Sequence, residues 1–231
     1  MEMWFSEFHT KDVKHSLRVT RHLYAKKSDY QQIDIFETPE FGRVLVLDGN
    51  VMLTERDEFI YDEMITHVPM AVHPNIRDIL VIGAGDGGVV RELTRYDRVR
   101  RIDLVEMDPQ VVEACREFLP GNACRMDDRR VHIHFENALR FIRSREAAYD
   151  LIIVDSTDPF GPSEGLFTRE FYGSCFNALR FVMCYPPGIP VLAPGERITA
   201  EILDYIQFAK EKGCSMTGPE DPDILRLNVL K

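Results

Sequence analysis

The chain has 231 residues and a formal net charge of −10, with 45% hydrophobic and 29% charged residues. This composition is typical of a globular protein that can bury one core and carry a small appended domain. The acidic balance argues against non-specific binding of nucleic acid and is compatible with a small cationic substrate.

The five cysteines form no CxxC pair and no metal-ligand spacing. We therefore expect reduced thiols in a cytoplasmic protein and predict no metal site. No apolar run approaches about 20 residues, and the N-terminus lacks the pattern of a signal peptide. We expect no membrane partner.

Residues 1–56 are rich in β-forming residues broken by turns. The stretch QQIDIFETPEFGRVLVLDGNVMLTE, residues 31–55, predicts three strands. Its turns fall at Pro39 to Gly42 and at Asp48-Gly49-Asn50, and the second has the residues of a tight hairpin. We expect a small N-terminal β-domain.

Residues 57–180 alternate between helical and strand periodicity. The segment 57–73 predicts an amphipathic helix with Phe59, Ile60, Met64, Ile65 and Val68 on one face. Such alternation is typical of an α/β fold with a doubly wound parallel sheet, in which ligands bind beyond the carboxyl ends of the strands. The predicted strands are 78–83, 101–106, 130–135 and 149–155, and the helices between them are 87–96, 109–119 and 137–144.

Residues 181–231 form a third, atypical zone. The segment 184–199 is irregular and punctuated by proline and glycine. A helical pattern at 200–212 and a short strand at 224–230 follow.

A glycine-rich turn, VIGAGDGG at residues 81–88, follows a strand and opens a helix. Gly83, Gly85 and Gly87 let the backbone approach a ligand, and the acid at the end of the next strand, Glu106, is placed to accept bonds from ribose hydroxyls. Asp86 lies inside the turn, where it would repel a pyrophosphate and attract a sulfonium or ammonium group. A tight structural turn is the simpler alternative, but the glycine-rich turn and Glu106 together favour a nucleoside-type ligand. Asp86 then favours an adenosyl sulfonium without a carboxylate over a dinucleotide such as NAD.

The stretch YDLIIVDSTDPFGP, residues 149–162, delivers Asp155 and Asp158 to the end of a predicted strand. A carboxylate there can hold an alkylammonium and accept its proton, and a second one can bind the far end of a diamine. The structural alternative is that Asp155 caps a turn and Asp158 starts the next one.

These motifs, together with residues 32–69, LVEMD at 104–108 and GLFTREFY at 165–172, resemble the polyamine aminopropyltransferases, the spermidine synthases. The resemblance covers residues 4–180 and implies a Rossmann-like domain of the S-adenosylmethionine-methyltransferase type. It implies aminopropyl transfer from decarboxylated S-adenosylmethionine, a co-substrate, to putrescine without a cofactor, in a homodimer or homotetramer.

The resemblance also implies roles for individual residues. Asp155 matches the general base, Asp86 and Asp158 the amine contacts, and Glu106 the ribose-binding acid. The remaining candidate contacts of the substrates are Gln31, Tyr61, Asp62, Asn137, Ala138, Ser156, Thr157 and Pro162.

The chain departs from the family pattern at several positions. Asp62 stands where the family usually has histidine, Ala84 replaces a glycine, and Asn137-Ala138 replaces an Asp-Gly pair. The last 50 or so residues instead resemble the C-terminal end of pyridoxal-phosphate-dependent ornithine, lysine and arginine decarboxylases. We therefore expect the sheet to be incomplete at its C-terminal end, and impaired activity is one expected consequence.

Two other functions stay open at this point. One is a non-catalytic module that binds polyamines or nucleosides. The other is an S-adenosylmethionine-dependent methyltransferase, which is disfavoured because Val81 occupies a position where many methyltransferases carry an acid.

Overall fold

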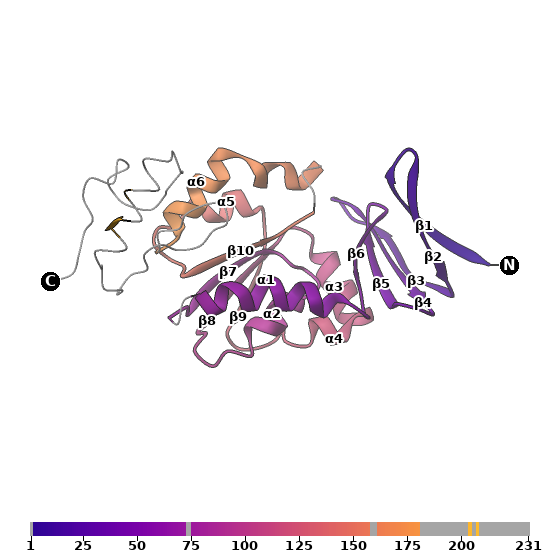
Figure 1. Cartoon of the computed structure of the whole chain (residues 1–231), viewed down its shortest axis with the longest axis horizontal. Coiled ribbons are helices and arrows are strands. Elements are labelled where there is room, and N and C mark those ends of the chain that lie inside the picture. The colour runs from indigo at the N-terminus through magenta and orange to yellow at the C-terminus, as the bar shows by residue number, and fades with distance from the viewer. Residues whose placement is uncertain (1, 73–74, 158–160, 181–202, 205–206, 208–231) are drawn as a thin grey trace.

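The structure is a computed structural model that describes residues 2–72, 75–157, 161–180, 203–204 and 207. Antiparallel strands at the N-terminus are followed by a parallel sheet with helices on both faces (Figure 1). The predicted helical pattern at 200–212 lies outside the described residues, except for Leu203, Asp204 and Gln207, and the strand at 224–230 lies wholly outside them.

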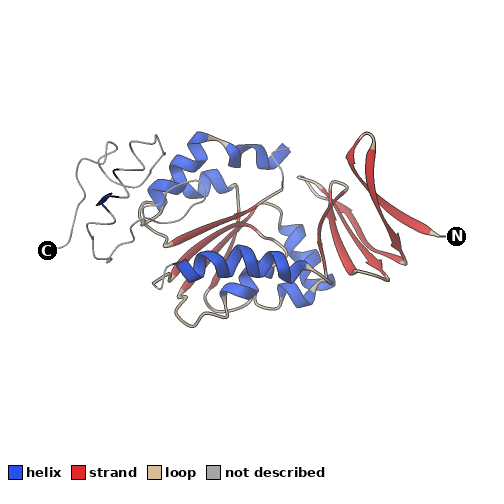
Figure 2. Cartoon of the chain, viewed as in Figure 1, coloured by secondary structure: helices blue, strands red, loops and turns tan. Residues whose placement is uncertain are grey.

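The N-terminal part contains two antiparallel sheets (Figure 2). The first pairs β1 (Met3–Thr10) with β2 (Val13–Val19). The second has the order β3-β4-β5-β6, with β3 (Arg21–Lys27), β4 (Gln32–Thr38), β5 (Gly42–Leu47) and β6 (Asn50–Thr54). The predicted tight hairpin is confirmed, because Asp48 and Gly49 have φ values of 48° and 83° between β5 and β6.

The parallel sheet has the order β10-β7-β8-β9, and its strands are those that the sequence predicts. They are β7 (Asp78–Gly83), β8 (Arg101–Glu106), β9 (Val131–Phe135) and β10 (Leu151–Asp155). The helices are α1 (Glu58–Val72), α2 (Gly88–Leu93), α3 (Pro109–Phe118), α4 (Pro120–Ala123), α5 (Ala138–Ile142), η1 (Gly161–Phe167) and α6 (Arg169–Ala178).

Alternate residues of the central strand β7 face the two helical layers. Ile79 and Val81 pack in a core with residues of α1, α2 and α4, whereas Leu80 and Ile82 pack with residues of α5 and α6. Strands buried on both faces need continuous apolar runs, which explains the sequence DILVIG. A third core joins α3 to β4 and β5, so the N-terminal sheet packs against a helix that follows the second strand of the parallel sheet.

The predicted apolar face of α1 is not the face that packs on the sheet. Phe59, Ile60, Met64 and Val68 are exposed, and Ile65 alone of the predicted set packs against the core. The buried positions instead include Asp62, Thr66 and Met70, spaced four residues apart. The buried face of the helix therefore includes polar side chains, and the spacing of apolar residues does not predict such a face.

In the described part of the chain, β10 is an edge strand of the parallel sheet. Beside its start, Leu179 forms a parallel bridge with Tyr149, and the Arg180 amide donates to the Tyr149 carbonyl over 3.0 Å. No helix among the described residues has the length and apolarity required to cross a membrane.

Candidate active site at the carboxyl ends of the strands

The carboxyl ends of three neighbouring strands meet at one edge of the parallel sheet. β7 ends at Gly83, β8 at Glu106 and β10 at Asp155, and β7 lies between the other two. The register pairs Asp155 with Gly83 directly. Residues separated by 72 positions in the chain therefore border one region, at the edge where a doubly wound parallel sheet is expected to bind ligands.

Gly83 allows the turn after β7 to touch β10. Its φ is +79°, and a Cβ there would lie 1.8 Å from the Asp155 carbonyl oxygen. The amide of Ala84 donates to the same oxygen over 3.2 Å. The backbone of Asp155 is thereby fixed by the glycine-rich turn, so its side chain is presented at the edge of the sheet.

Asp86 lies in the turn just before α2. Its Oδ1 accepts a hydrogen bond from the Gly88 amide over 2.9 Å, and Gly87, with φ of 94°, is the N-cap of the helix. Burial raises the pKa of the Asp86 carboxyl, and backbone hydrogen bonds oppose this. In its ionised form, this carboxylate favours a cationic group on the ligand over a phosphate.

Glu106 faces the turn from the end of β8. A Cβ at Gly85 would lie 2.8 Å from Glu106 Oε2, so a side chain there would force this carboxyl to shift. Its Oε1 accepts from the Asp108 amide over 2.9 Å. Burial raises the pKa of Glu106 to about 7, with Asp108 and Asp86 adding to the rise. The predicted contact of Glu106 with ribose hydroxyls stays a prediction.

Gln31 reaches this region from the N-terminal sheet. Its Nε2 donates to Asp108 Oδ2 over 3.1 Å, and the Ser28 hydroxyl donates to the same oxygen over 2.6 Å. Asp108 is the N-cap of α3, where its Oδ1 accepts from the Gln110 amide. Asp108 and Ser28 were not predicted as parts of the site. The Asp-Pro start of α3 is a recognisable capping signal, but the contact with Gln31 spans 77 residues.

Asp155 is held by a tyrosine from α1. The Tyr61 hydroxyl donates to Asp155 Oδ1 over 2.7 Å. Burial raises the pKa of Asp155 to about 6; the Tyr61 hydrogen bond opposes this, whereas the charge of Asp86 adds to it. Asp155 is therefore an ionised carboxylate at neutral pH with more basicity than an ordinary one, which suits a proton acceptor.

The segment after β10 is described in part. Ser156 and Thr157 are half-buried, and the Thr157 hydroxyl hydrogen-bonds the Ser163 hydroxyl of η1. Asp158 lies outside the described residues, and so does the side chain of Pro162. The predicted roles of those two side chains stay predictions.

Asn137 and Ala138 lie just beyond the end of β9. The Asn137 side chain is the N-cap of α5, and its Oδ1 accepts from the Arg140 amide over 3.1 Å. The capping bond uses one acceptor site of the amide, and the Nδ2 group is left to donate to a ligand. The structure assigns Asn137 a capping role, and the predicted nucleoside contact of Asn137 and Ala138 stays a prediction.

Asp62 points toward α2. It is 4% exposed, and a Cβ at Gly88 would lie 1.9 Å from its Oδ2. Its Oδ2 is 3.8 Å from Arg91 Nη2, beyond hydrogen-bond distance. Burial and a hydrogen bond to Glu58 raise the pKa of Asp62 to about 9, with Asp86 and Glu58 charges adding to the rise. The buried cluster of Glu58, Asp62 and Arg91 was not predicted from the sequence.

One other group of charged residues, on α1 and α2, is satisfied within the protein. Glu63, His67 and Glu92 bring ligand atoms within 4.8 Å of one another, but Arg95 Nη1 already pairs with Glu92 over 2.6 Å. The Tyr96 hydroxyl lies 2.7 Å from His67 Nδ1. The cluster is a salt-bridge network between α1 and α2, and we assign no ligand to it.

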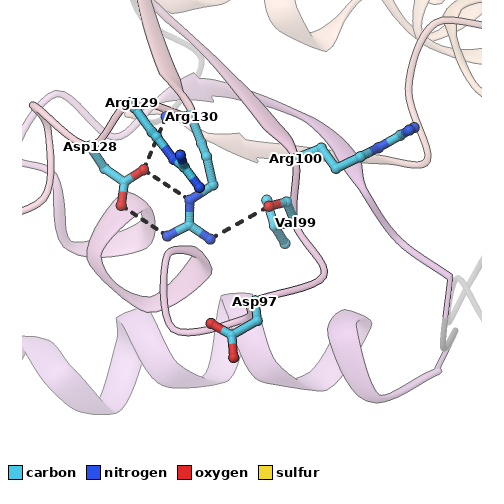
Figure 3. A pocket seen from close by; sticks show the side chains of 6 residues that line it. All are labelled: Asp97, Val99, Arg100, Asp128, Arg129 and Arg130. Carbon is cyan, nitrogen blue, oxygen red and sulfur yellow. Dashed lines mark hydrogen bonds and ion pairs between the residues drawn. The ribbon is translucent and has the colours of Figure 1, made fainter.

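A hollow of about 550 Å³ lies before β8 and β9, at the amino ends of the strands (Figure 3). Arg130 spans it, with hydrogen bonds to both carboxylate oxygens of Asp128 and to the Val99 carbonyl. It lies at the opposite end of the sheet from Asp155, so it takes no part in the site. Its lining residues are Asp97, Val99, Arg100, Asp128, Arg129 and Arg130.

The fold and site together define a Rossmann-like α/β protein with three acidic side chains, Asp86, Glu106 and Asp155, at the carboxyl ends of its parallel strands. Family comparison agrees: residues 58–185 match the spermine/spermidine synthase domain and residues 3–55 the spermidine synthase tetramerisation domain. The chain belongs to the spermine/spermidine synthase family. Residues 177–221 match a different family, the C-terminal domain of Orn/Lys/Arg decarboxylases.

Similar proteins include two bacterial polyamine aminopropyltransferases. The one from Lachnoclostridium phytofermentans is 62% identical over 179 residues, and the one from Clostridium botulinum is 61% identical over 179 residues. Each alignment covers 78% of this chain and 63% of the relative. The chain thus spans less than two thirds of the length of these relatives.

Solved structures of spermidine synthases share the fold. A spermidine synthase in complex with the transition state analogue AdoDATO is 44% identical, with a TM-score of 0.76 over 78% of this chain and 62% of that one. The spermidine synthase of Thermotoga maritima is also 44% identical, with a TM-score of 0.74 over 78% of this chain and 61% of that one. The predicted family and the predicted fold class are confirmed.

Proposed function

We propose that this chain transfers an aminopropyl group from decarboxylated S-adenosylmethionine to putrescine, forming spermidine and methylthioadenosine. The observation that carries the proposal is the convergence of Asp86, Glu106 and Asp155 at one sheet edge, with Tyr61 bonded to Asp155 over 2.7 Å. The chain covers 63% of the length of the relative from Lachnoclostridium phytofermentans. The activity of such relatives therefore supports the proposal, and an assay of this chain is the test.

The nucleoside is bound between the glycine-rich turn and the end of β8 in this proposal. Glu106 accepts hydrogen bonds from the ribose hydroxyls. Asp108 connects Gln31 to Glu106, because its carboxylate accepts from the Gln31 side chain and its amide donates to Glu106. Asp86 faces the positively charged part of the donor. A donor carboxylate would be repelled by Asp86, which is why the decarboxylated compound is favoured.

The chemical step is a displacement at carbon. The amine nitrogen uses its lone pair to form a bond to the aminopropyl CH₂ next to sulfur, and the C–S bond electrons return to sulfur. Methylthioadenosine leaves as a neutral thioether, and the proton of the attacking nitrogen passes to Asp155. The sulfonium carries its own leaving group, so the reaction requires no resident metal or organic cofactor.

We propose a homodimer or homotetramer as the working assembly, with small molecules as the other partners and no nucleic acid. The family match of residues 3–55 to a tetramerisation domain supports this. So does the exposed apolar surface on the first two strands, where Trp4 is 55% and Phe8 66% exposed. The thiols of Cys115, Cys124 and Cys175 are free, which suits the proposed cytoplasmic location.

Product formation tests the proposal directly. The full chain should release methylthioadenosine from decarboxylated S-adenosylmethionine when a panel of diamines is supplied, with putrescine among the accepted ones. A chain that binds added methylthioadenosine but forms none from decarboxylated S-adenosylmethionine with any diamine would support the non-catalytic binding module. Methyl transfer from S-adenosylmethionine would instead support a methyltransferase.

A further inference from the structure

The side chain of Asp108 connects the start of α3 to the turn between β3 and β4. Asp108 is 1% exposed, and three donors converge on its two carboxylate oxygens. The Ser28 hydroxyl and Gln31 Nε2 donate to Oδ2 over 2.6 and 3.1 Å, and the Gln110 amide donates to Oδ1 over 3.0 Å. Each of these partners offers a proton, so the carboxylate acts as an acceptor toward all of them.

The direction of the Ser28 hydrogen bond follows from the backbone around it. Ser28 Oγ accepts from the amides of Tyr30 and Gln31, each over 3.0 Å, so its own proton is left to donate. Its nearest acceptor is Asp108 at 2.6 Å, and the Gln31 carbonyl is 3.1 Å away. The turn between β3 and β4 therefore holds the Gln31 side chain beside an oxygen that accepts.

Asp108 consequently determines which way the Gln31 amide is turned. A side-chain amide carries an NH₂ group on one branch and a carbonyl oxygen on the other, and only the NH₂ group can donate to a carboxylate. Because Nε2 bonds Asp108, Gln31 Oε1 lies on the opposite branch, and it has no hydrogen-bond partner among the described residues. Gln31 is half-buried, so Oε1 is available to accept a hydrogen bond from a ligand.

The backbone of Asp108 orients a second acceptor. The Asp108 amide donates to Glu106 Oε1 over 2.9 Å, and the other oxygen, Oε2, faces Gly85. The acceptor on Gln31 and the acceptor on Glu106 are thus set by different atoms of Asp108. A change in the Asp108 side chain should alter the first and leave the second, so experiment can separate them.

We infer that Asp108 is a positioning residue of the nucleoside site, whose carboxylate turns the Gln31 amide so that Oε1 faces the nucleoside as an acceptor. This inference rests on the proposed function for the identity of the ligand. Asp108 acts through Gln31 and makes no contact with the ligand itself. Its role goes beyond capping α3, because the cap requires only the bond to the Gln110 amide.

An exchange of donor and acceptor tests the inference. Asp108→Asn keeps the shape of the side chain and is an equally good helix cap, but its NH₂ group would meet the NH₂ group of Gln31. Gln31→Glu would instead place two carboxylates against each other. Each single variant of the full chain should bind methylthioadenosine about 3- to 10-fold more weakly in titration calorimetry, which corresponds to one hydrogen bond. In the double variant the new amide can donate to the new carboxylate, so the affinity should return to within about twofold of the native value.

A matched variant controls for the added charge. Gln32→Glu makes the same change one residue along the chain, where the side-chain Nε2 lies 3.5 Å from the Ile33 carbonyl and not on Asp108. This variant should bind methylthioadenosine as the native chain does, and it should not restore the affinity of Asp108→Asn.

Equal affinities of the native chain and Asp108→Asn, or a loss that Gln31→Glu does not restore, would overturn the inference and leave Asp108 as a helix cap. A native chain that binds no methylthioadenosine would overturn it as well. Failure of the proposed function has a different signature. If the exchange restores affinity but no methylthioadenosine forms from decarboxylated S-adenosylmethionine, the positioning role stands and aminopropyl transfer fails. If methylthioadenosine forms and the affinities are equal, the transfer stands and the role of Asp108 fails.

Discussion

Replacing Asp155 by asparagine removes the proposed proton acceptor while keeping its shape. The backbone of Asp155 is fixed by Ala84, whose amide donates to its carbonyl over 3.2 Å, so the variant should fold as the native chain does. Nucleoside binding should survive, because Glu106 and the glycine-rich turn carry it. Turnover at neutral pH should fall.

The size of the loss follows from two protonation equilibria. With a pKa of about 6, Asp155 is about 97% ionised at pH 7.5 and ready to accept a proton. An alkylammonium with a pKa of about 10.4 is neutral in only about one molecule per thousand at that pH. Loss of the base should therefore lower turnover by about 100- to 1,000-fold, within the usual range for general bases.

The pH dependence separates a base from a structural group. The native rate should rise as Asp155 loses its proton near pH 6 and then level off, since the carboxylate is the active form above its pKa. The Asp155→Asn rate should instead increase about tenfold per unit from pH 7 to 9, as neutral amine becomes available. The assay is methylthioadenosine release against pH with saturating substrates. Near-normal turnover of the variant at neutral pH would refute the assignment and make Asp155 a structural cap.

Four further predictions concern the surroundings of the base. Tyr61→Phe removes a hydrogen bond to the charged form of Asp155, so the pKa of that carboxyl should rise and the acid limb of the pH–rate profile should move upward; an unchanged profile would contradict the contact. Asp86→Asn should narrow the preference for decarboxylated S-adenosylmethionine over S-adenosylmethionine in calorimetry, and equal affinities in the native chain would show that Asp86 does not select the ligand. Ala84 has φ of +55°, so Ala84→Gly should stabilise the chain by about 0.5–1 kcal/mol in denaturant unfolding, and destabilisation would show that the methyl group packs favourably. Grafting the corresponding C-terminal segment of a family member after Leu179 should raise turnover. The graft would complete the walls of the diamine site, and excluding water there strengthens the electrostatic interactions between the carboxylates and the amine. A folded graft with unchanged turnover would show that the native tail suffices.

The strands and their functional ends could be predicted because each signal is local. DILVIG and LIIVD are apolar runs, and parallel strands place the residues at their carboxyl ends along one edge of the sheet. The pattern of strands, with acidic residues at or just after their carboxyl ends, therefore predicts that Glu106, Asp86 and Asp155 lie at the same edge of the sheet. The tight turn at Asp48-Gly49 is local in the same way.

The rest of the site depends on contacts between distant residues. Tyr61 and Asp155 are 94 positions apart, and Gln31 meets Asp108 across 77. A single sequence carries no signal for such pairs. The orientation of α1 shows the same limit, because its apolar residues suggest one inner face while burial follows Asp62, Thr66 and Met70.

The measurement that tests aminopropyl transfer most directly follows the transferred group itself. Decarboxylated S-adenosylmethionine labelled in its aminopropyl carbons is incubated with putrescine and the full chain, and the products are analysed by mass spectrometry. The proposal predicts labelled spermidine and unlabelled methylthioadenosine in equal amounts, formed much more slowly by Asp155→Asn. Label that stays on the donor in the presence of a folded, nucleoside-binding chain would contradict the proposed function.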